Sequence, residues 1–503
     1  MTLASVQQQL SSDSPLTPTM LERAAQPITI SVSDRTERLV RQGSEFVEDC
    51  LSGDRPIYGA TTGFGPLVTF GGRAEAADQC DNALQHLTAG QGPDLPAAVV
   101  RAAVLVRIWS LSRGMSGVSA QALQGLRNML ATTFTPAVPT LGSVGASGDL
   151  VPLAHIVQSL RGVGFAYVDG VRMPAATALT QASLQPLELT ARDGLSMVNG
   201  TSVTTAAAGL ALASLQRSHE VALLLSAMLT DLLGAEPAFI QPRLLHAFGH
   251  PETERAGQRL AYWLEGTRSS GDRPLQEPYS VRCVPQLLGA VDSAMGWAGQ
   301  VIGRDLGAVS DNPLFFPDDN LVAHGGNFFG QPAAFACDLL SNVTTQTGNL
   351  AERQLDLLVD PHRNTGLPPM LSTKAGQQHA VQGVQLVSTA IVVAMRRACV
   401  PAGIQSVPTN LHNQDVVPFG TQAAITALEQ ARNLRLLHGS LAVALRQAAH
   451  LRPERVTAPR CAQAFAEVAK VVAPIERDRP LHDDVRAAAD RLDRFVEQFA
   501  HAR

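Results

Sequence analysis

The 503-residue chain is poor in lysine and in aromatic side chains, and its net charge is slightly negative. Lys374 and Lys470 are its two lysines, and arginine supplies the remaining positive charge. A pyridoxal-phosphate enzyme needs a Schiff-base lysine. Lys374 has no phosphate-binding motif beside it, so we expect it at the surface. The net charge of −5 argues against a nucleic-acid partner, which would favour a basic face.

The sequence shows no cysteine motif, no secretory signal and no membrane-spanning segment. The six cysteines are dispersed and none has zinc-ligand spacing, which is typical of a reduced, cytosolic protein. Residues 1–14 lack the basic and apolar regions of a secretory signal. The longest apolar stretch, 221–233, is too short to cross a bilayer and predicts a buried helix. We therefore expect a cytoplasmic protein with no metal and no membrane partner.

What the chain has in quantity is alanine and leucine, which favour helix packing. Long apolar-periodic segments follow one another after residue 205, and loops with Pro, Gly and Asn separate them. The segments predicted as helices are 204–233, 332–360, 375–399, 421–451 and 483–500. Their lengths indicate an elongated helical bundle whose loops present polar residues at its ends.

The first part of the chain is more mixed. Alternating residues at 28–32 predict a short strand, and periodic segments at 97–111 and 119–130 predict helices. Asp169-Gly170 lies between short apolar runs and predicts a hairpin turn. We expect a mostly α fold with a smaller mixed domain at 1–205, and a long-helix bundle with a C-terminal helical part at 206–503.

The glycine-rich turn at 142–150 contains Ala146-Ser147-Gly148, which can become an electrophile. If the amide nitrogen of Gly148 attacks the carbonyl carbon of Ala146 and water is lost, a five-membered ring forms in the backbone. Loss of the Ser147 hydroxyl then leaves an exocyclic methylidene. Glycine permits the tight backbone that this cyclisation needs. The product, 4-methylidene-imidazol-5-one, is a carbon electrophile that ordinary side chains cannot provide.

Four further segments carry candidate chemistry. Tyr58 lies in a glycine-rich loop, where its phenol can be a base if its pKa is lowered, or simply a packing side chain. Asn199 can cap a following helix or bind substrate. Arg282, three residues after Tyr279, can bind a carboxylate through two hydrogen bonds, although a lone arginine is more often a surface residue. Residues 413–415 form a dense polar run.

Together these segments resemble the ammonia-lyase and aminomutase family that uses the methylidene-imidazolone group. The same holds for Ser310-Asp311-Asn312-Pro313 and Gly325-Gly326-Asn327-Phe328. The resemblance covers nearly the whole chain and is closest to bacterial tyrosine ammonia-lyases. It implies a bundle of the fumarase/aspartase-like superfamily and a homotetramer whose active sites mix residues of several subunits.

The resemblance also implies roles. Ala146, Ser147 and Gly148 would cyclise, and no metal or diffusible cofactor would be needed. Tyr58 would remove the β-proton, and Arg282, from a different subunit, would hold the carboxylate. Asn199 and Tyr279 would position the substrate and the prosthetic group. The other residues implied in substrate binding are Gly65, Leu87, Phe328, Asn413 and Gln414.

Two positions bear on the substrate. His86 and Leu87 lie in a segment, 82–92, that resembles the selectivity segment of bacterial tyrosine ammonia-lyases, where the histidine would bond the para-hydroxyl. A buried polar group left unpaired by phenylalanine costs binding; otherwise His86 is a core histidine. Gln414 is neutral where histidine ammonia-lyases place a glutamate. We expect conversion of L-tyrosine to trans-4-coumarate and ammonia, with a phenylalanine lyase, an aminomutase and a non-catalytic scaffold as alternatives.

Overall fold

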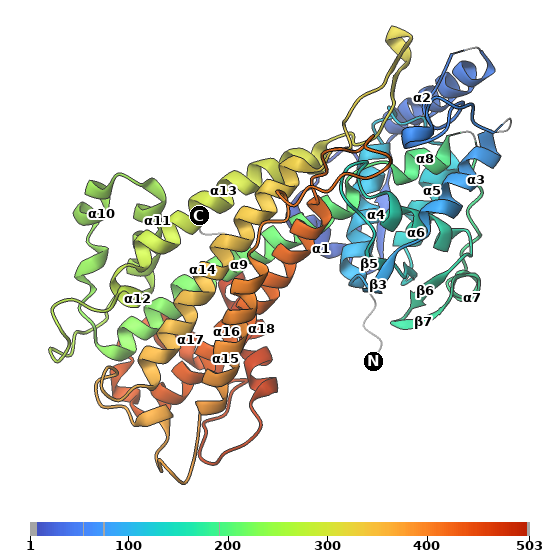
Figure 1. Cartoon of the computed structure of the whole chain (residues 1–503). Helices are drawn as coiled ribbons and strands as arrows, with labels where there is room; N and C mark the ends of the chain where they lie inside the picture. Colours follow the sequence, from blue (N-terminus) through green and yellow to red (C-terminus); the bar gives the residue numbers. More distant parts are fainter. Residues whose placement is uncertain (1–7, 54, 74–75, 191, 500–503) are drawn as a thin grey trace. The chain divides into compact units, whose positions relative to one another are not determined.

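The structure, a computed structural model, describes residues 8–53, 55–73, 76–190 and 192–499. These residues are mostly helical, with a few short sheets, which confirms the predicted mostly α class (Figure 1). They form two compact units. The first unit comprises Met1–Ala211, Gly299–Asp338 and Pro401–Ile425, and the second comprises Leu212–Ala298, Leu339–Val400 and Thr426–Arg503. The division into domains 1–205 and 206–503 stays a prediction.

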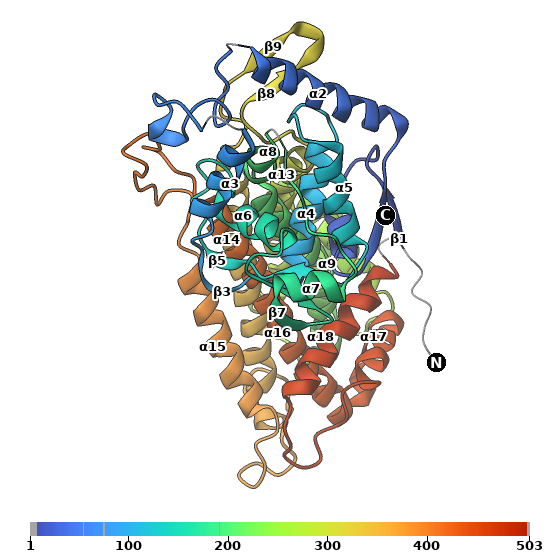
Figure 2. The same cartoon turned by 90° about the vertical axis from the view of Figure 1, so that its right-hand side faces the viewer.

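The first unit contains the short strands and most of the short helices. Its elements are β1 (Gln8–Ser11), α1 (Pro18–Arg23), β2 (Ile28–Ser31), α2 (Asp34–Ser52), α3 (Ala76–Leu87), β3 (Gln91–Asp94), α4 (Ala97–Leu111), α5 (Ala120–Leu130), β4 (Thr135–Pro136), β5 (Pro139–Leu141), α6 (Leu150–Leu160), β6 (Phe165–Val168), β7 (Val171–Pro174), α7 (Ala175–Gln181), α8 (Asp193–Val198), β8 (Leu314–Phe316) and β9 (Leu321–Ala323). Figure 2 shows α3, α4, α5, α6 and α8 grouped in this unit.

The described residues of the second unit form helices joined by turns and loops, without strands. Those wholly inside it are α10 (Pro242–Phe248), α11 (Pro251–Trp263), α12 (Tyr279–Arg282), α15 (Gln382–Ala398), α17 (Pro459–Ala469) and α18 (His482–Glu497). Four of the five unit boundaries fall within the four longest helices, and the fifth lies after α15, between Val400 and Pro401. The four helices are α9 (Ser202–Leu233), α13 (Val284–Gly307), α14 (Gln331–Val359) and α16 (Gly420–Leu451).

The small sheets of the first unit pair as follows. β1 lies parallel to β2, with Leu10 opposite Ile30, whereas β3–β5, β4–β6–β7 and β8–β9 are antiparallel. The predicted hairpin is confirmed: Asp169 and Gly170 join β6 to β7 with φ of 51° and 80°. Both residues take the left-handed backbone that a two-residue hairpin turn requires, which explains the Asp-Gly sequence.

Helix α4 is the centre of the first unit, because residues 99–111 are all buried. Its Arg101 is 2% exposed and has no carboxylate partner among the residues that the structure describes. Its guanidinium donates instead to main-chain oxygens around it. The acceptors are the carbonyls of Ala24, Gln26, Leu130, Thr132 and Phe134. Arginine has five N–H donors, so Arg101 can bond the segments that follow α1 and α5 to helix α4.

The second unit packs through apolar and aromatic faces. The Trp263 ring of α11 lies 5.9 Å from that of Phe495 on α18 and 5.2 Å from that of Phe499, measured between centroids. Residues 221–233 of α9 are buried throughout, as the sequence predicted. No helix among the described residues is long and apolar enough to span a membrane. Lys374 is exposed, also as predicted.

One helix prediction is wrong at its start, and the long helices α2 and α13 were not predicted. The helix expected at 375–399 begins only at Gln382, because Ala380 has a φ of 45° that a right-handed helix cannot contain. Asp478 accepts hydrogen bonds from the N–H groups of His379 and Ala380 and holds this non-helical segment. Helix α13 was missed altogether. Its five glycines weakened the helical pattern, although buried residues such as Leu288 and Ile302 anchor it.

Candidate active site

The turn that contains Ala146-Ser147-Gly148 has two residues in the left-handed backbone conformation that favours glycine. Gly145 and Gly148 have φ of 74° and 67°, and isolated bridges join Gly145 and Ala146 to Gly148. A Cβ atom on Gly148 would lie 2.2 Å from the carbonyl oxygen of Gly200. Such a distance is a clash with main chain, so glycine is required at 148 by the close approach as well as by its φ.

Asp149, directly after this turn, is fully buried and binds two helix starts. Its Oδ2 accepts hydrogen bonds from the N–H groups of Val203 and Thr204, each 2.8 Å away, at the beginning of α9. Its Oδ1 accepts from the hydroxyls of Thr204 at 2.8 Å and Thr421 at 2.6 Å, the latter at the start of α16. Burial raises the pKa of Asp149, and these hydrogen bonds oppose that rise.

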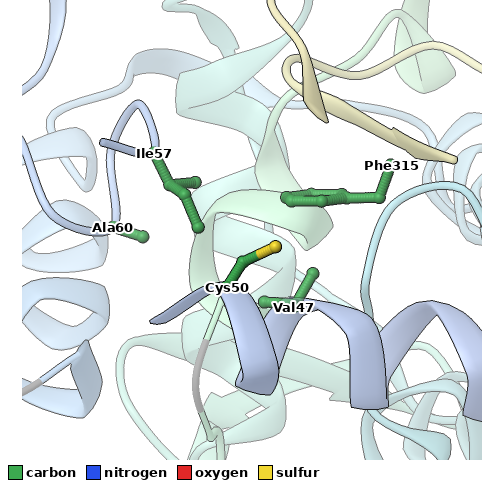
Figure 3. Packing of buried hydrophobic residues seen from close by; sticks show 5 residues of the cluster. All are labelled: Val47, Cys50, Ile57, Ala60 and Phe315. Carbon is green, nitrogen blue, oxygen red and sulfur yellow. The ribbon is translucent and has the colours of Figure 1, made fainter. Parts of the chain in front are cut away.

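The loop that carries Tyr58 is fixed on both sides by buried apolar side chains. Ile57 and Ala60 pack with Val47 and Cys50 of α2 and with Phe315 of β8, as Figure 3 shows. Tyr58 and Gly59 lie in the chain between these two anchored residues. A short stretch of rigid loop is therefore enough to place one phenol.

The hydroxyl of Tyr58 accepts a hydrogen bond from the N–H of Gly65 at 2.9 Å, and its ring packs edge-to-face on Phe64. Its own N–H donates to Nε2 of His324 at 3.3 Å. Burial raises the pKa of Tyr58 above the usual tyrosine value, and the Gly65 hydrogen bond opposes the rise. Within this chain the environment therefore does not supply the lowered pKa that a tyrosinate at neutral pH would need.

A cavity of about 930 Å³ lies in the first unit beside this turn and loop. Several residues singled out from the sequence line it. They are Tyr58, Gly65, His86, Leu87, Ser147, Gly148, Asn199 and Gln414. They come from chain segments far apart in the sequence, from Tyr58 to Gln414. A cavity of this size holds a small-molecule ligand.

Ser147 and Gln414 meet in this cavity. Nε2 of Gln414 donates to Oγ of Ser147 at 2.7 Å. Gln414 closes a short loop, since the main chains of Thr409 and Gln414 exchange two hydrogen bonds of 3.0 and 3.3 Å. Between them residues 410–412 have φ of 51°, 51° and 61°, a conformation unfavourable for residues other than glycine. The two backbone hydrogen bonds hold this loop in a conformation that it would not adopt alone.

Asn199 is 2% exposed and ends α8, so it does not cap the start of α9 as the sequence allowed. Its Nδ2 donates to the carbonyl oxygen of Asn312 at 3.1 Å. Its Oδ1 is buried without a partner among the described residues. A buried amide oxygen without a hydrogen bond is costly in an isolated core. Because this residue lines the cavity, its free oxygen marks a position for a donor on a bound molecule.

His86 lies in the last turn of α3, where Nδ1 is 3.0 Å from the carbonyl oxygen of Asn82. Its ring centroid is 6.0 Å from that of Phe64. His86 is exposed and faces the cavity, so it is not a core histidine.

The remaining predicted residues do not line this cavity. Ala146 is buried, Phe328 is half-buried and Asn413 is exposed, all in the first unit. Tyr279 and Arg282 lie on α12 in the second unit, where the guanidinium carbon of Arg282 is 4.6 Å from the centroid of the Tyr279 ring. Nε of Arg282 donates to the carbonyl oxygen of Glu277 at 2.9 Å.

Sequence reasoning missed several cavity residues. The most informative are Phe64, Asn82, Arg73 and Asn410. Asn82 could have been found, because it is four residues before His86 and therefore on the same helix face. Within the described part of the chain no group of three or more His, Cys, Asp or Glu side chains could hold a metal ion.

Comparison with known proteins places this chain in a family. The sequence profile of the aromatic amino acid lyases matches residues 16–470. A histidine ammonia-lyase of Symbiobacterium thermophilum is 38% identical over 466 residues, which cover 92% of each chain. A tyrosine ammonia-lyase of Cereibacter sphaeroides is 38% identical over 466 residues, covering 87% of this chain and 88% of the other.

Solved structures agree. A tyrosine aminomutase from Streptomyces globisporus superposes with a TM-score of 0.91 at 29% identity, over 98% of both chains. The phenylalanine aminomutase of Pantoea agglomerans gives 0.90 at 26% identity, over 97% of this chain and 100% of the other. The chain belongs to the aromatic amino acid lyase family, whose members depend on the methylidene-imidazolone group.

The hydrogen bonds of Asp149 give a stability prediction. Asp149→Ala leaves two buried N–H groups and three buried hydroxyls, those of Ser143, Thr204 and Thr421, with a lost acceptor, so the free energy of unfolding should fall by about 3 kcal/mol. Urea titration followed by circular dichroism measures this. Asp318→Ala, at an exposed position, is the matched control. Equal stability losses in the two variants would contradict the role given to Asp149.

Proposed function

We propose that this protein converts L-tyrosine to trans-4-coumarate and ammonia by means of a methylidene-imidazolone group formed from Ala146, Ser147 and Gly148. The observation that carries the proposal is the convergence of Ser147, Tyr58, Asn199 and His86 on one cavity. Each has a separate task in such a reaction. Family membership supports the reaction class, while the choice of tyrosine depends on His86 and its surroundings.

The residues of the turn suit the prosthetic group. Left-handed glycines at 145 and 148 permit a ring in the backbone, and the Ser147 side chain faces the cavity. Gln414 stands at hydrogen-bond distance from the Ser147 oxygen, where it can orient the hydroxyl before that oxygen is lost as water. Once formed, the group supplies an electrophilic carbon that turns the substrate amine into a leaving group. No metal or diffusible cofactor is required.

Tyr58 acts as the base that removes the β-proton. Its phenol lines the cavity, and the Gly65 N–H favours its charged form. Asn199 offers its unpaired Oδ1 to the substrate amine, whose N–H groups are donors. Further contacts to the substrate or the prosthetic group come from Gly65, Leu87, Phe328, Asn413 and Gln414.

Arg282 binds the substrate carboxylate and Tyr279 assists it, each supplied by a partner subunit of a homotetramer. The guanidinium has N–H donors beyond the one that Glu277 engages, so it can form the paired hydrogen bonds that a carboxylate accepts. Sharing of the site between subunits would make activity depend on assembly. We expect the assembled enzyme to be cytoplasmic.

Tyrosine is favoured over histidine and phenylalanine by two side chains. His86 provides a polar partner for a ring hydroxyl, whereas phenylalanine would leave it unpaired. Gln414 is neutral and gives an imidazole ring no charge partner. Histidine remains the second candidate, because a histidine ammonia-lyase is as similar to this chain as the tyrosine enzyme is. The aminomutase neighbours make a β-amino acid the alternative product.

Ser147→Ala tests the origin of the electrophile. Peptide mass analysis of the wild-type chain should show residues 146–148 lighter by two water molecules, and the variant should show no such loss. The variant should keep its far-ultraviolet spectrum and have no measurable lyase activity, because the alanine has no hydroxyl to eliminate. Ser52→Ala, at an exposed position, is the control. Full activity of Ser147→Ala would end the proposal.

Tyr58→Phe tests the base. The loss of the phenol should lower kcat about 10²–10⁴-fold while the fold is kept. In the wild type, the raised pKa of Tyr58 leaves the phenol protonated at neutral pH, so kcat/KM should keep rising as the pH is raised towards the alkaline range. Tyr262→Phe, in the second unit, should retain the wild-type rate and profile. A flat alkaline profile, or an unaffected Tyr58→Phe, would exclude Tyr58 as the base.

His86→Phe tests the choice of substrate. The change removes the polar partner of the ring hydroxyl, so the ratio of kcat/KM for tyrosine over phenylalanine should fall at least about tenfold. Steady-state rates with both amino acids measure the ratio. An unchanged ratio would show that selectivity lies elsewhere in the cavity.

A further inference from the structure

The polarity of the cavity around His86 is set by its neighbours. Nδ1 of His86 is 3.0 Å from the carbonyl oxygen of Asn82, which can only accept a hydrogen bond. In the neutral ring, Nδ1 therefore carries the proton and Nε2 keeps its lone pair. The nitrogen left for a ligand is an acceptor. His86 consequently recognises a group that donates a hydrogen bond, such as a hydroxyl.

The side chain of Asn82 has the opposite polarity, and for a similar reason. Its Oδ1 accepts a hydrogen bond of 3.1 Å from Nη2 of Arg73. A guanidinium can only donate, so the amide oxygen must be the atom that faces Arg73. The amide nitrogen, Nδ2, then has two N–H groups and no partner among the described residues. What Asn82 leaves for a ligand is a donor.

Asn82 and His86 lie one turn apart on α3, on the same helix face, and both line the cavity. The side chain of Gln79, three residues before Asn82, is already engaged. Gln79 donates from Nε2 to the carbonyl oxygen of Thr62 and accepts from the N–H of Arg73, so both ends of its amide are satisfied. Phe64 adds an apolar wall next to His86. Asn82 and His86 therefore present one donor and one acceptor to the ligand, beside the guanidinium of Arg73.

We propose that Asn82 is a second specificity-determining residue: its Nδ2–H group donates a hydrogen bond to the ring hydroxyl of the substrate, while Nε2 of His86 accepts that hydroxyl's O–H. A hydroxyl satisfies both partners, because it is a donor and an acceptor at once. An amino group satisfies His86 but is a poor acceptor for Asn82, and a methoxy group can only accept. The inference rests on the proposed function, since it assumes an aromatic substrate in this cavity.

Asn82→Asp is the sharpest variant, because it keeps size and exchanges the donor for a carboxylate oxygen. The ratio of kcat/KM for tyrosine over phenylalanine should fall at least about tenfold. Gln85→Glu makes the same chemical change on the same helix at an exposed position that does not line the cavity, and should leave the ratio unchanged. An equal loss for both substrates in Asn82→Asp would indicate a merely structural role and overturn the inference.

A binding measurement separates polarity from folding. The wild type should bind 4-coumarate at least about tenfold more tightly than 4-aminocinnamate or 4-methoxycinnamate, as competitive inhibitors. In Asn82→Asp the preference should invert towards 4-aminocinnamate, whose amine can donate to both side chains. Equal wild-type affinities for the three acids would overturn the inference, and this test stands even if the variant does not fold. If the wild type forms no acrylate from any aromatic amino acid, the proposed function itself fails.

Discussion

Asp149 is the constraint on which the site depends. A single buried carboxylate joins the turn of residues 143–148 to the first turns of α9 and α16, which follow it by more than 50 and more than 270 residues. It binds N–H groups that a helix start leaves unpaired, and its charge is favourable there because helix N-termini carry positive partial charge. The turn is thus held by rigid elements and not by its own short sequence. A backbone that must cyclise needs such support, since the glycines that permit the ring also make the free chain flexible.

Two kinds of interaction fix the side chains around the cavity, namely apolar packing and hydrogen bonding. On one side, Tyr58 is placed by the buried cluster of Ile57, Ala60 and Phe315, which is apolar and serves position alone (Figure 3). On the other side, His86 and Asn82 have their polarity fixed by a carbonyl and a guanidinium. Apolar packing therefore sets the position of Tyr58, and hydrogen bonds to groups of fixed character set what His86 and Asn82 can recognise. The same burial that positions Tyr58 also raises its pKa.

The features that could be predicted from the sequence are those set by interactions between residues close together in the chain. Local patterns predicted α4, α5, α9, α14, α16, α18 and the Asp169-Gly170 hairpin, because helical periodicity and turn chemistry act over a few residues. The start of α15 was wrong, because the long-range hydrogen bonds from Asp478 decide it. The resemblance singled out five residues that line one cavity, Tyr58, His86, Ser147, Asn199 and Gln414. No local pattern could reveal that Arg73 orients the Asn82 amide. The roles of Tyr279 and Arg282 stay predictions, since they depend on a partner subunit.

The most direct measurement is the product formed from each of L-tyrosine, L-phenylalanine and L-histidine by the purified enzyme, separated by chromatography with ultraviolet detection. We expect trans-4-coumarate from tyrosine to dominate, with cinnamate minor and urocanate undetectable. Dominant cinnamate would keep the reaction and contradict the part played by His86 and Asn82. Dominant urocanate would assign the cavity to histidine, and a β-amino acid would make the enzyme an aminomutase. Absence of turnover with all three amino acids would contradict the account as a whole.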